Sequence, residues 1–243
     1  MAKLLSYPLS ALYYPVFGSI LLLFDGLQRI TYLFGYQAHK ICVDILNFLL
    51  LRGLNLIGTR FVFDMPFALE KNQSYIIVAN HQSTYDIPPL IWYFRKVHPK
   101  FVGKKELGKG IPSISFNLRN GGSVLIDRKN PKQALEKIKA FGERLAATHR
   151  SAVIFPEGTR SRNHEPRPFR YAGLMQLVEV MPNAKLLGVT INHSWKISRH
   201  GSFPLGIGTK MVLKVHSPIA IPKEGIADTL SQLEEQIKAS VLP

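Results

Sequence analysis

After about residue 60, short apolar runs alternate with longer amphipathic stretches, and this alternation limits the folds open to the chain. Runs rich in β-branched residues predict strands at residues 75–79, 152–155, 186–191 and 211–215. Helices are expected from Ser83 or Asp86 to Phe94, from Asn130-Pro131 onward, over residues 171–180 and over residues 226–241. Runs that are apolar throughout are typical of strands buried on both faces. The pattern predicts an α/β fold with a mostly parallel sheet flanked by helices.

The first 60 residues hold most of the apolar excess. Residues 4–24 are 21 positions without a charge, a length that could cross a bilayer core of ~30 Å. Pro8 and Pro15 interrupt this stretch, and the scattered charges of residues 26–59 are typical of helices lying in a membrane interface. A monotopic helical hairpin, one membrane-spanning helix and a buried core helix all stay open. We expect residues 1–59 to form N-terminal membrane-associated helices and residues 60–243 to form the α/β domain.

The net charge of +15 is concentrated in the centre of the chain. Residues 95–170 carry 18 Lys/Arg and 6 Asp/Glu. A field of this sign attracts nucleic acid, anionic lipid or a phosphorylated substrate. Aromatic residues do not interleave with the basic ones as they do in a stacking surface for single strands. This argues against nucleic acid as a partner, but composition alone does not choose between a membrane and a phosphorylated substrate.

Several function classes lack their signatures. The single cysteine, Cys42, excludes an internal disulfide and a cysteine-cluster metal site. The eight histidines are scattered, which predicts no metal site. The chain has no Gly-x-Ser-x-Gly elbow, no Walker loop and no dinucleotide fingerprint. Neither a metal nor a cofactor is expected.

The first candidate site begins where the strand at residues 75–79 ends. Asn80 and His81 follow it directly, at the edge where open α/β sheets place their ligands. Asp86 lies near the expected start of the next helix, where the helix dipole favours its anionic form. Its carboxylate could hold one imidazole nitrogen and leave the other free as a base. The alternative is that Ser83 and Asp86 only cap the helix and His81 is a turn residue.

The second candidate site is the turn Phe155-Pro156-Glu157-Gly158-Thr159-Arg160-Ser161. It leaves a predicted strand, so it should lie at the same sheet edge as His81. An arginine there is suited to bidentate recognition of phosphate. A salt bridge between Glu157 and Arg160 is the structural alternative. Lys105 and Arg128 belong to two further basic segments, residues 103–107 and 126–128, and either could be a solvated face.

In this order, the segments resemble the lysophospholipid/glycerolipid acyltransferase family, and within it the bacterial 1-acyl-sn-glycerol-3-phosphate acyltransferases. The family's Asn-His-x4-Asp block matches residues 80–86, and its Phe-Pro-Glu-Gly-Thr-Arg-Ser block matches residues 155–161. Residues 103–107 with 126–128, and residues 168–173, resemble further blocks. The similarity covers roughly residues 73–220. Gly188 departs from it, since the fourth block usually has a proline there.

The resemblance implies acyl transfer from acyl-CoA or acyl carrier protein to the sn-2 hydroxyl of 1-acyl-sn-glycerol-3-phosphate, giving phosphatidic acid. His81 and Asp86 would be catalytic. Residues that would bind the substrate are Glu157, Gly158, Thr159, Arg160, Lys105 and Arg128. The family's acyl thioester is a co-substrate, so no cofactor is implied. The protein would be associated with a bacterial inner membrane, with its catalytic domain on the cytoplasmic side.

Other functions stay open beside this one. The same chemistry could act on glycerol-3-phosphate, another lysophospholipid or a lyso-ornithine lipid. A basic protein without catalytic activity, bound to a membrane or to nucleic acid, is a further alternative. A scaffold of that kind would have no need of His81, Asp86, Glu157 and Arg160 together.

Overall fold

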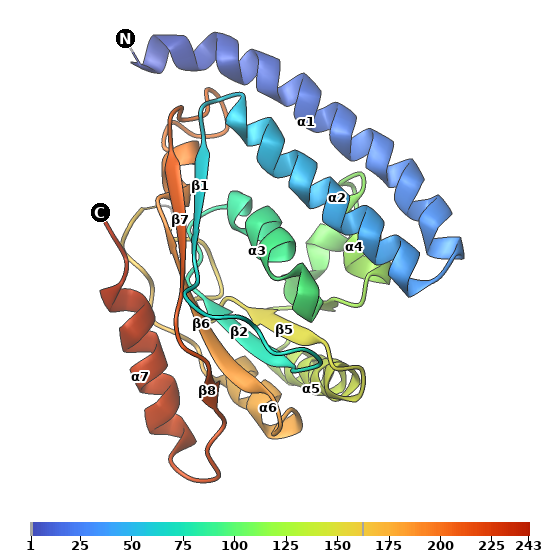
Figure 1. Ribbon diagram of the computed structural model, residues 1–243, viewed down its shortest axis with the longest axis vertical. Helices are drawn as coiled ribbons and strands as arrows, with labels where there is room; N and C mark the ends of the chain where they lie inside the picture. The colour runs from blue at the N-terminus through green and yellow to red at the C-terminus, as the bar shows by residue number, and fades with distance from the viewer. Residues whose placement is uncertain (1, 162) are drawn as a thin grey trace.

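The computed structural model describes residues 2–161 and 163–243, and a twisted sheet lies at its centre (Figure 1). Within these residues the sheet has eight strands, in the order β1-β7-β6-β2-β5-β3-β4, with β8 paired to β6. Their bounds are β1 Arg60–Asp64, β2 Tyr75–Ala79, β3 Pro99–Lys104, β4 Val124–Ile126, β5 Ser151–Ile154, β6 Lys185–Asn192, β7 Lys210–Val215 and β8 Ile219–Ala220. Pairing is parallel except where β6 meets β7 and β8. The predicted, mostly parallel sheet is confirmed.

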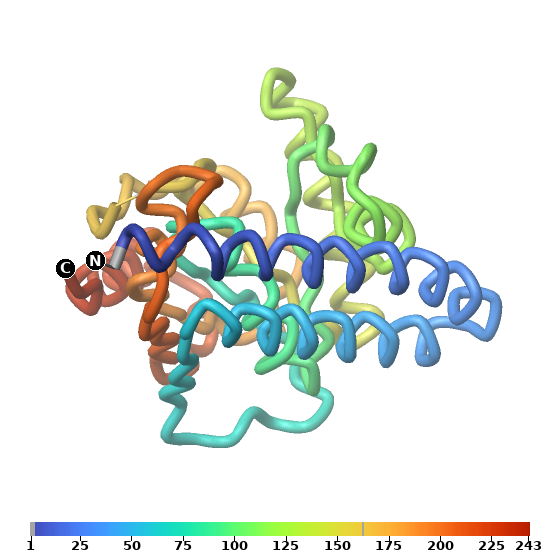
Figure 2. The backbone as a smooth tube through the Cα atoms, turned by 90° about the horizontal axis from the view of Figure 1, so that it is seen from above, coloured from blue at the N-terminus to red at the C-terminus, as the bar shows by residue number. Residues whose placement is uncertain are grey.

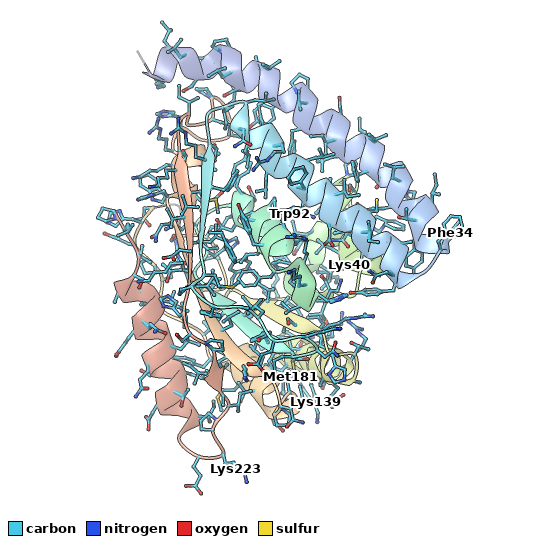
Figure 3. The ribbon with its side chains drawn as sticks, viewed as in Figure 1. Phe34, Lys40, Trp92, Lys139, Met181 and Lys223 are labelled. Carbon is cyan, nitrogen blue, oxygen red and sulfur yellow. The ribbon has the colours of Figure 1, made fainter. Side chains whose placement is uncertain are left out.

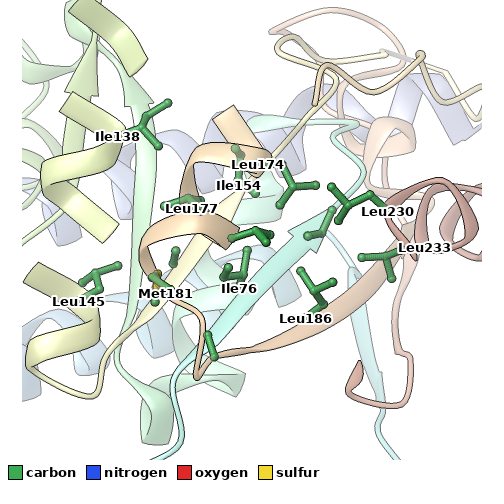
Figure 4. Packing of buried hydrophobic residues seen from close by; sticks show 14 of the residues in the cluster. Ile76, Ile138, Leu145, Ile154, Leu174, Leu177, Met181, Leu186, Leu230 and Leu233 are labelled. Carbon is green, nitrogen blue, oxygen red and sulfur yellow. The ribbon is translucent and has the colours of Figure 1, made fainter. Parts of the chain in front are cut away.

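Helices cover both faces of the sheet. One face packs α5 (Pro131–Ala147), α6 (Ala172–Val180) and α7 (Ile226–Ala239) onto β2, β5 and β6. Figure 4 shows this packing, with Ile138, Leu177 and Leu233 from the three helices converging on Ile76 and Leu186. The other face packs α2 (Tyr36–Asn55) and α3 (Ile87–Tyr93) onto the same strands and β7. Because β2, β5 and β6 are buried on both sides, their sequences are apolar without alternation.

The predicted helices are present, with small changes at their ends. A 3-10 turn, η1 (Thr84–Asp86), precedes α3, so both suggested start points mark real features. The Asn130 side chain caps α5 by accepting a hydrogen bond from the Gln133 amide at 3.1 Å. A short helix, α4 (Ile114–Asn120), and the 3-10 turns η2 (Arg95–Val97), η3 (Lys105–Gly108) and η4 (Ser194–Ser198) were not predicted.

The N-terminal segment forms a helical hairpin. α1 (Ala2–Leu33) continues through both of its prolines and turns at Gly35, whose φ of 91° suits glycine, into α2. Figure 2 shows the two helices side by side and antiparallel. Among the described residues, α1 is the one helix long and apolar enough to cross a membrane, and it is mostly exposed. That exposure contradicts the buried-core alternative.

The hairpin also packs on the α/β domain. Tyr13 of α1 and Leu54 and Ile57 at the end of α2 are buried with Ile197 and Leu205 of the η4 region. The outer surface of the hairpin stays apolar and exposed, with large side chains at Leu4, Leu5, Leu12, Leu22, Leu23, Ile30, Leu33, Phe34, Ile41 and Ile45. We call this the apolar face of the hairpin. The division at residue 59 into two parts stays a prediction.

Candidate active site

His81 and Asp86 are in direct contact where β2 ends. The imidazole Nδ1 lies 2.8 Å from Asp86 Oδ2. The Asp86 side chain is fully buried, whereas the His81 side chain is 16% exposed. A carboxylate can only accept hydrogen bonds, so Nδ1 carries the proton and Nε2 has the free lone pair. Among the described residues Nε2 has no hydrogen-bond partner. The pair therefore has the geometry of an oriented base.

The same carboxylate caps the helix that follows. Asp86 Oδ2 accepts hydrogen bonds from the backbone amides of Gln82 at 2.8 Å and Ser83 at 3.0 Å. Ser83 completes a capping box, since its Oγ accepts from the Tyr85 amide at 3.0 Å. Helix capping and orientation of His81 are thus two roles of one side chain, and not alternatives.

Two contacts from the β6 region hold this loop, and neither was predicted. Ser194, the first residue of η4, is buried and donates a hydrogen bond to Asp86 Oδ1. The Asn80 side chain donates to the Ile191 carbonyl at 2.9 Å and accepts from the Ile191 amide at 2.6 Å. These partners lie more than a hundred residues away in the chain, and no motif marks Ser194. Only the adjacency of β2 and β6 brings them together.

The predicted turn at residues 155–161 lies against His81. The Phe155 ring stacks on the imidazole, with centroids 4.1 Å apart and 19° between planes. Glu157 is buried, and its oxygens accept from the backbone amides of His81 at 2.7 Å and Arg167 at 3.0 Å. Burial raises the pKa of Glu157, and these two amides oppose the rise. The contacts tie Glu157 to the protein backbone, and its role in binding substrate stays a prediction.

The rest of the turn carries the basic groups. Gly158 has a φ of 69°, which explains a glycine at this position. Its carbonyl accepts a hydrogen bond from Arg128, and the Arg170 side chain lies against it. Lys105 forms an ion pair of 3.7 Å with Asp127, the neighbour of Arg128. Arg128 thus contacts the turn directly, whereas Lys105 contacts the neighbouring Asp127, and a role of either residue in binding an anion stays a prediction. Arg170 was missed as a site residue.

Thr159 and Arg160 are exposed on the outside of this turn. The Ser161 amide donates to the His81 carbonyl at 2.8 Å, so the backbone beside Arg160 is fixed to the base. No salt bridge between Glu157 and Arg160 is present within the described residues. The Arg160 side chain is therefore exposed to solvent, and its role in binding a phosphate stays a prediction.

Close packing explains why position 188 is a glycine. In β6 it pairs with Val78, and a Cβ at this position would lie 2.8 Å from the Leu233 side chain of α7 and 3.2 Å from His216. Any larger residue would therefore require the Leu233 side chain to shift. This departure from the family pattern therefore concerns the interface with α7.

The described residues hold no cluster of three or more His, Cys, Asp or Glu side chains that could bind a metal. A polar pair with a free imidazole nitrogen, beside several guanidinium groups, suits proton transfer on a phosphorylated substrate.

Comparison with known proteins decides the family. The model of the Acyltransferase family matches residues 61–192, which include both motifs and β1 through β6. The chain belongs to the Acyltransferase family. The His81–Asp86 pair and the turn at residues 155–161 both lie inside the region that this acyltransferase shares with its family.

Its relatives include 1-acyl-sn-glycerol-3-phosphate acyltransferases. One from Helicobacter pylori is 42% identical over 93 residues, which are 37% of each chain. One from Saccharomyces cerevisiae is 25% identical over 93% of this chain and 71% of its own length. The chain thus aligns with little more than a third of the Helicobacter relative.

A solved structure has the same fold. The crystal structure of PlsC from Thermotoga maritima, a 1-acyl-sn-glycerophosphate (LPA) acyltransferase, superposes with a TM-score of 0.80. The alignment covers 98% of this chain and 95% of that one at 22% identity. The likeness extends over the N-terminal hairpin as well as the α/β domain.

Proposed function

We propose that this acyltransferase moves a fatty acyl group from acyl-CoA or acyl carrier protein to the sn-2 hydroxyl of 1-acyl-sn-glycerol-3-phosphate. The product is phosphatidic acid, a precursor in phospholipid biosynthesis. The observation that carries the proposal is the His81–Asp86 pair at 2.8 Å, placed beside the basic turn at residues 155–161. The names of the relatives support this acceptor.

In the proposed mechanism His81 is the general base. Nε2 takes the proton of the acceptor hydroxyl while the hydroxyl oxygen bonds to the thioester carbonyl carbon. The C–S bond then breaks, and the leaving thiolate takes the proton back from Nε2. Asp86 keeps the ring in the required tautomer and stabilises the imidazolium that forms. Proton transfer of this kind contributes roughly 10²–10⁴-fold to the rate.

The basic groups would hold the phosphate of the acceptor. Arg160 is exposed next to the residue that is bonded to His81, so a phosphate bound there brings the glycerol hydroxyl towards Nε2. Arg128, just after β4, and Lys105, at the start of η3, add positive charge, and the Gly158-Thr159 backbone shapes the turn. Glu157 fixes the backbone of both His81 and Arg167, and so holds the base and the turn together.

The apolar face of the hairpin gives the reaction a location. The acyl chain of a lysolipid acceptor lies in a bilayer, and burial of exposed leucines there would hold the protein at its surface. We propose association with a bacterial inner membrane, the catalytic domain facing the cytoplasm. Either a monotopic hairpin or a span by α1 meets this requirement.

An acceptor panel tests the function. Thiol release from oleoyl-CoA and from oleoyl-acyl carrier protein is measured with 1-acyl-glycerol-3-phosphate, glycerol-3-phosphate, lysophosphatidylcholine and a lyso-ornithine lipid, and the product is identified by mass. Phosphatidic acid formed from the first acceptor is the expected result. If the enzyme used only another acceptor, the proposed acceptor would be wrong, but acyl transfer would still stand. No release with either donor would contradict acyl transfer itself.

A further inference from the structure

A second group of cations lies away from the active site, where β3 begins. Lys100 is the second residue of β3, four positions before Lys104 at the strand's other end. That distance is roughly 13 Å along a strand. The Lys100 side chain lines a cavity between α2, the start of β3 and the end of α4. The space at the mouth of this cavity, about 380 Å³, is largely open to solvent, and the enclosed part is small.

Three cationic side chains gather around Gly122, beside this cavity, and of the three Lys100 also lines it. A Cβ at Gly122 would lie 3.5 Å from the Lys100 side chain and 3.9 Å from Arg150 Nη1. Arg144 donates to the Gly122 carbonyl at 2.9 Å. Lys100 and Arg150 also lie over the ring of Tyr36, at 5.0 and 3.5 Å from its centroid. We call Lys100, Arg144 and Arg150 the second basic cluster.

The second basic cluster has little negative charge to balance it. Asp44 is the carboxylate that lines the cavity, and it is already paired with Lys40 at 2.5 Å. Lys100 is 9% exposed and forms no hydrogen bond or ion pair with any described residue. Burial and then Arg150 lower its pKa to about 8. The Tyr36 ring and the already paired Asp44 offset the buried charge of Lys100 only in part, and an anion at the mouth of the cavity would offset it further.

The cavity lies beside the end of the hairpin. Tyr36, whose ring is covered by the two cations, directly follows the turn at Phe34 and Gly35. Leu33 is 82% exposed and Phe34 is 76% exposed. Figure 3 shows Phe34 at the outer end of the hairpin, with Lys40 a turn further along α2. An apolar tip next to a cationic cavity matches the two parts of a phospholipid, its chains and its phosphate.

We propose that the second basic cluster binds the phosphate of an anionic phospholipid whose acyl chains lie against Leu33 and Phe34. This lipid is distinct from the reacting acceptor, because the cluster lies at the beginning of β3 and His81 lies at the end of β2. Bound there, it fixes the depth and orientation of the hairpin at an anionic membrane. The proposal does not depend on which acceptor the enzyme uses.

Vesicle binding tests the site. Kd is measured for phosphatidylcholine vesicles and for vesicles in which part of the lipid is phosphatidylglycerol. The test variant is Lys100→Met/Arg150→Met, and the matched control is Lys129→Met/Lys132→Met, which removes two exposed charges from the same basic stretch. In the test variant, the ratio of Kd for phosphatidylcholine vesicles to Kd for phosphatidylglycerol vesicles should fall about tenfold. Loss of one partner of a buried charge pair weakens binding by at least that factor. The control should keep the preference. Equal losses in both would overturn the site.

Thermal unfolding with Lys100→Met distinguishes a lipid from a free ion and reports on folding. Without lipid, the variant should melt at or above the wild-type temperature, because an unpaired buried charge has been removed. Phosphatidylglycerol vesicles should raise the melting temperature of the wild type by more than that of the variant, which still binds through the apolar face of the hairpin. A rise with inorganic phosphate alone would identify a free-phosphate site and overturn the lipid. No difference in response between the two proteins would overturn the site.

Discussion

At the scale of single residues, the site depends on how completely Asp86 is bonded. Oδ2 accepts from His81 and two backbone amides, and Oδ1 accepts from Ser194. Four donors fix both oxygens of a carboxylate that has no contact with solvent. A charge held in this way does not move when the imidazole becomes protonated, which is the electrostatic requirement of the proposed mechanism.

Ser194 is therefore expected to be a positioning residue. Ser194→Ala removes a hydrogen bond to a charged group, and such a bond is worth about 1.5–3 kcal/mol. Since about 1.4 kcal/mol corresponds to a factor of ten, turnover should fall roughly tenfold or more. KM should change little, and the pH profile of kcat should shift, because the field on His81 changes. Ser198→Ala, an exposed serine of the same turn, is the control. Wild-type turnover with an unshifted profile in Ser194→Ala would refute this role.

Arg160 gives a prediction about substrate binding. Arg160→Ala should raise KM for the phosphorylated acceptor by about tenfold or more, as loss of a charge-assisted contact does. KM for acyl-CoA serves as the internal control and should stay within about twofold, because uniform losses would indicate misfolding. Steady-state kinetics with both substrates varied provide the measurement. An unchanged acceptor KM would argue against a phosphate contact.

The sequence predicted this site in part. His81, Asp86 and the turn at residues 155–161 are local motifs at strand ends, so their shared sheet edge followed from the parallel fold. Ser194 and Arg170 were not predicted as site residues, because each depends on a contact between distant segments. Helix capping and orientation of the base were treated as competing explanations of Asp86, although one carboxylate does both.

At the scale of elements, three of the four predicted strands are those where burial is complete, and the fourth, β7, is buried only at some of its residues. The four predicted strands include β2, β5 and β6, which are buried on both faces. β1 lies at the sheet edge and is only half-buried, β4 has three half-buried residues, and β3 combines a proline, a glycine and two lysines. Their sequences lack a continuous apolar run, so tertiary pairing and not local pattern makes them strands.

The hairpin gives the prediction at this scale. Leu22 and Leu23 of α1 are 66% and 61% exposed on its apolar face. Leu22→Glu/Leu23→Glu should weaken vesicle binding by about tenfold or more, since burying one leucine is worth about 1.5–3 kcal/mol. Met175→Glu changes an exposed apolar residue on α6, on the other side of the sheet, and is the control. Vesicle sedimentation measures both. Equal binding by the double variant and the control would contradict membrane contact through this face.

At the scale of the whole molecule, one basic stretch supplies two separate groups of cations. Residues 95–170 contribute Arg128 and Arg160 to the active-site edge and the second basic cluster to the opposite end of β3. The charge excess visible in the sequence is thus divided between two places that the sequence could not separate. Its two parts would act on a reacting phosphate and on a membrane phosphate.

Stability should depend on pH through Lys100. Its pKa falls from 10.5 to about 8 on folding, so between these values the unfolded chain holds a proton that the folded protein releases. Stability due to this group therefore rises with pH across that window and is lowest below it. Below pH 8 the melting temperature of Lys100→Met should exceed that of the wild type, and this difference should decline towards pH 10.5. Arg150, Asp44, Lys40 and Arg144, which face Lys100, are present in both proteins. A difference that is flat with pH would contradict the lowered pKa.

The most direct test of the central claim is acceptor-dependent thiol release from oleoyl-CoA by His81→Ala, compared with the wild type and with His164→Ala. His164 is an exposed histidine outside the His81–Asp86 pair. The proposed mechanism predicts that release with 1-acyl-glycerol-3-phosphate falls by roughly 10²–10⁴-fold in His81→Ala, while His164→Ala and the binding of both variants to vesicles stay at the wild-type level. Near-wild-type release by a folded, membrane-bound His81→Ala protein would contradict His81 as the base.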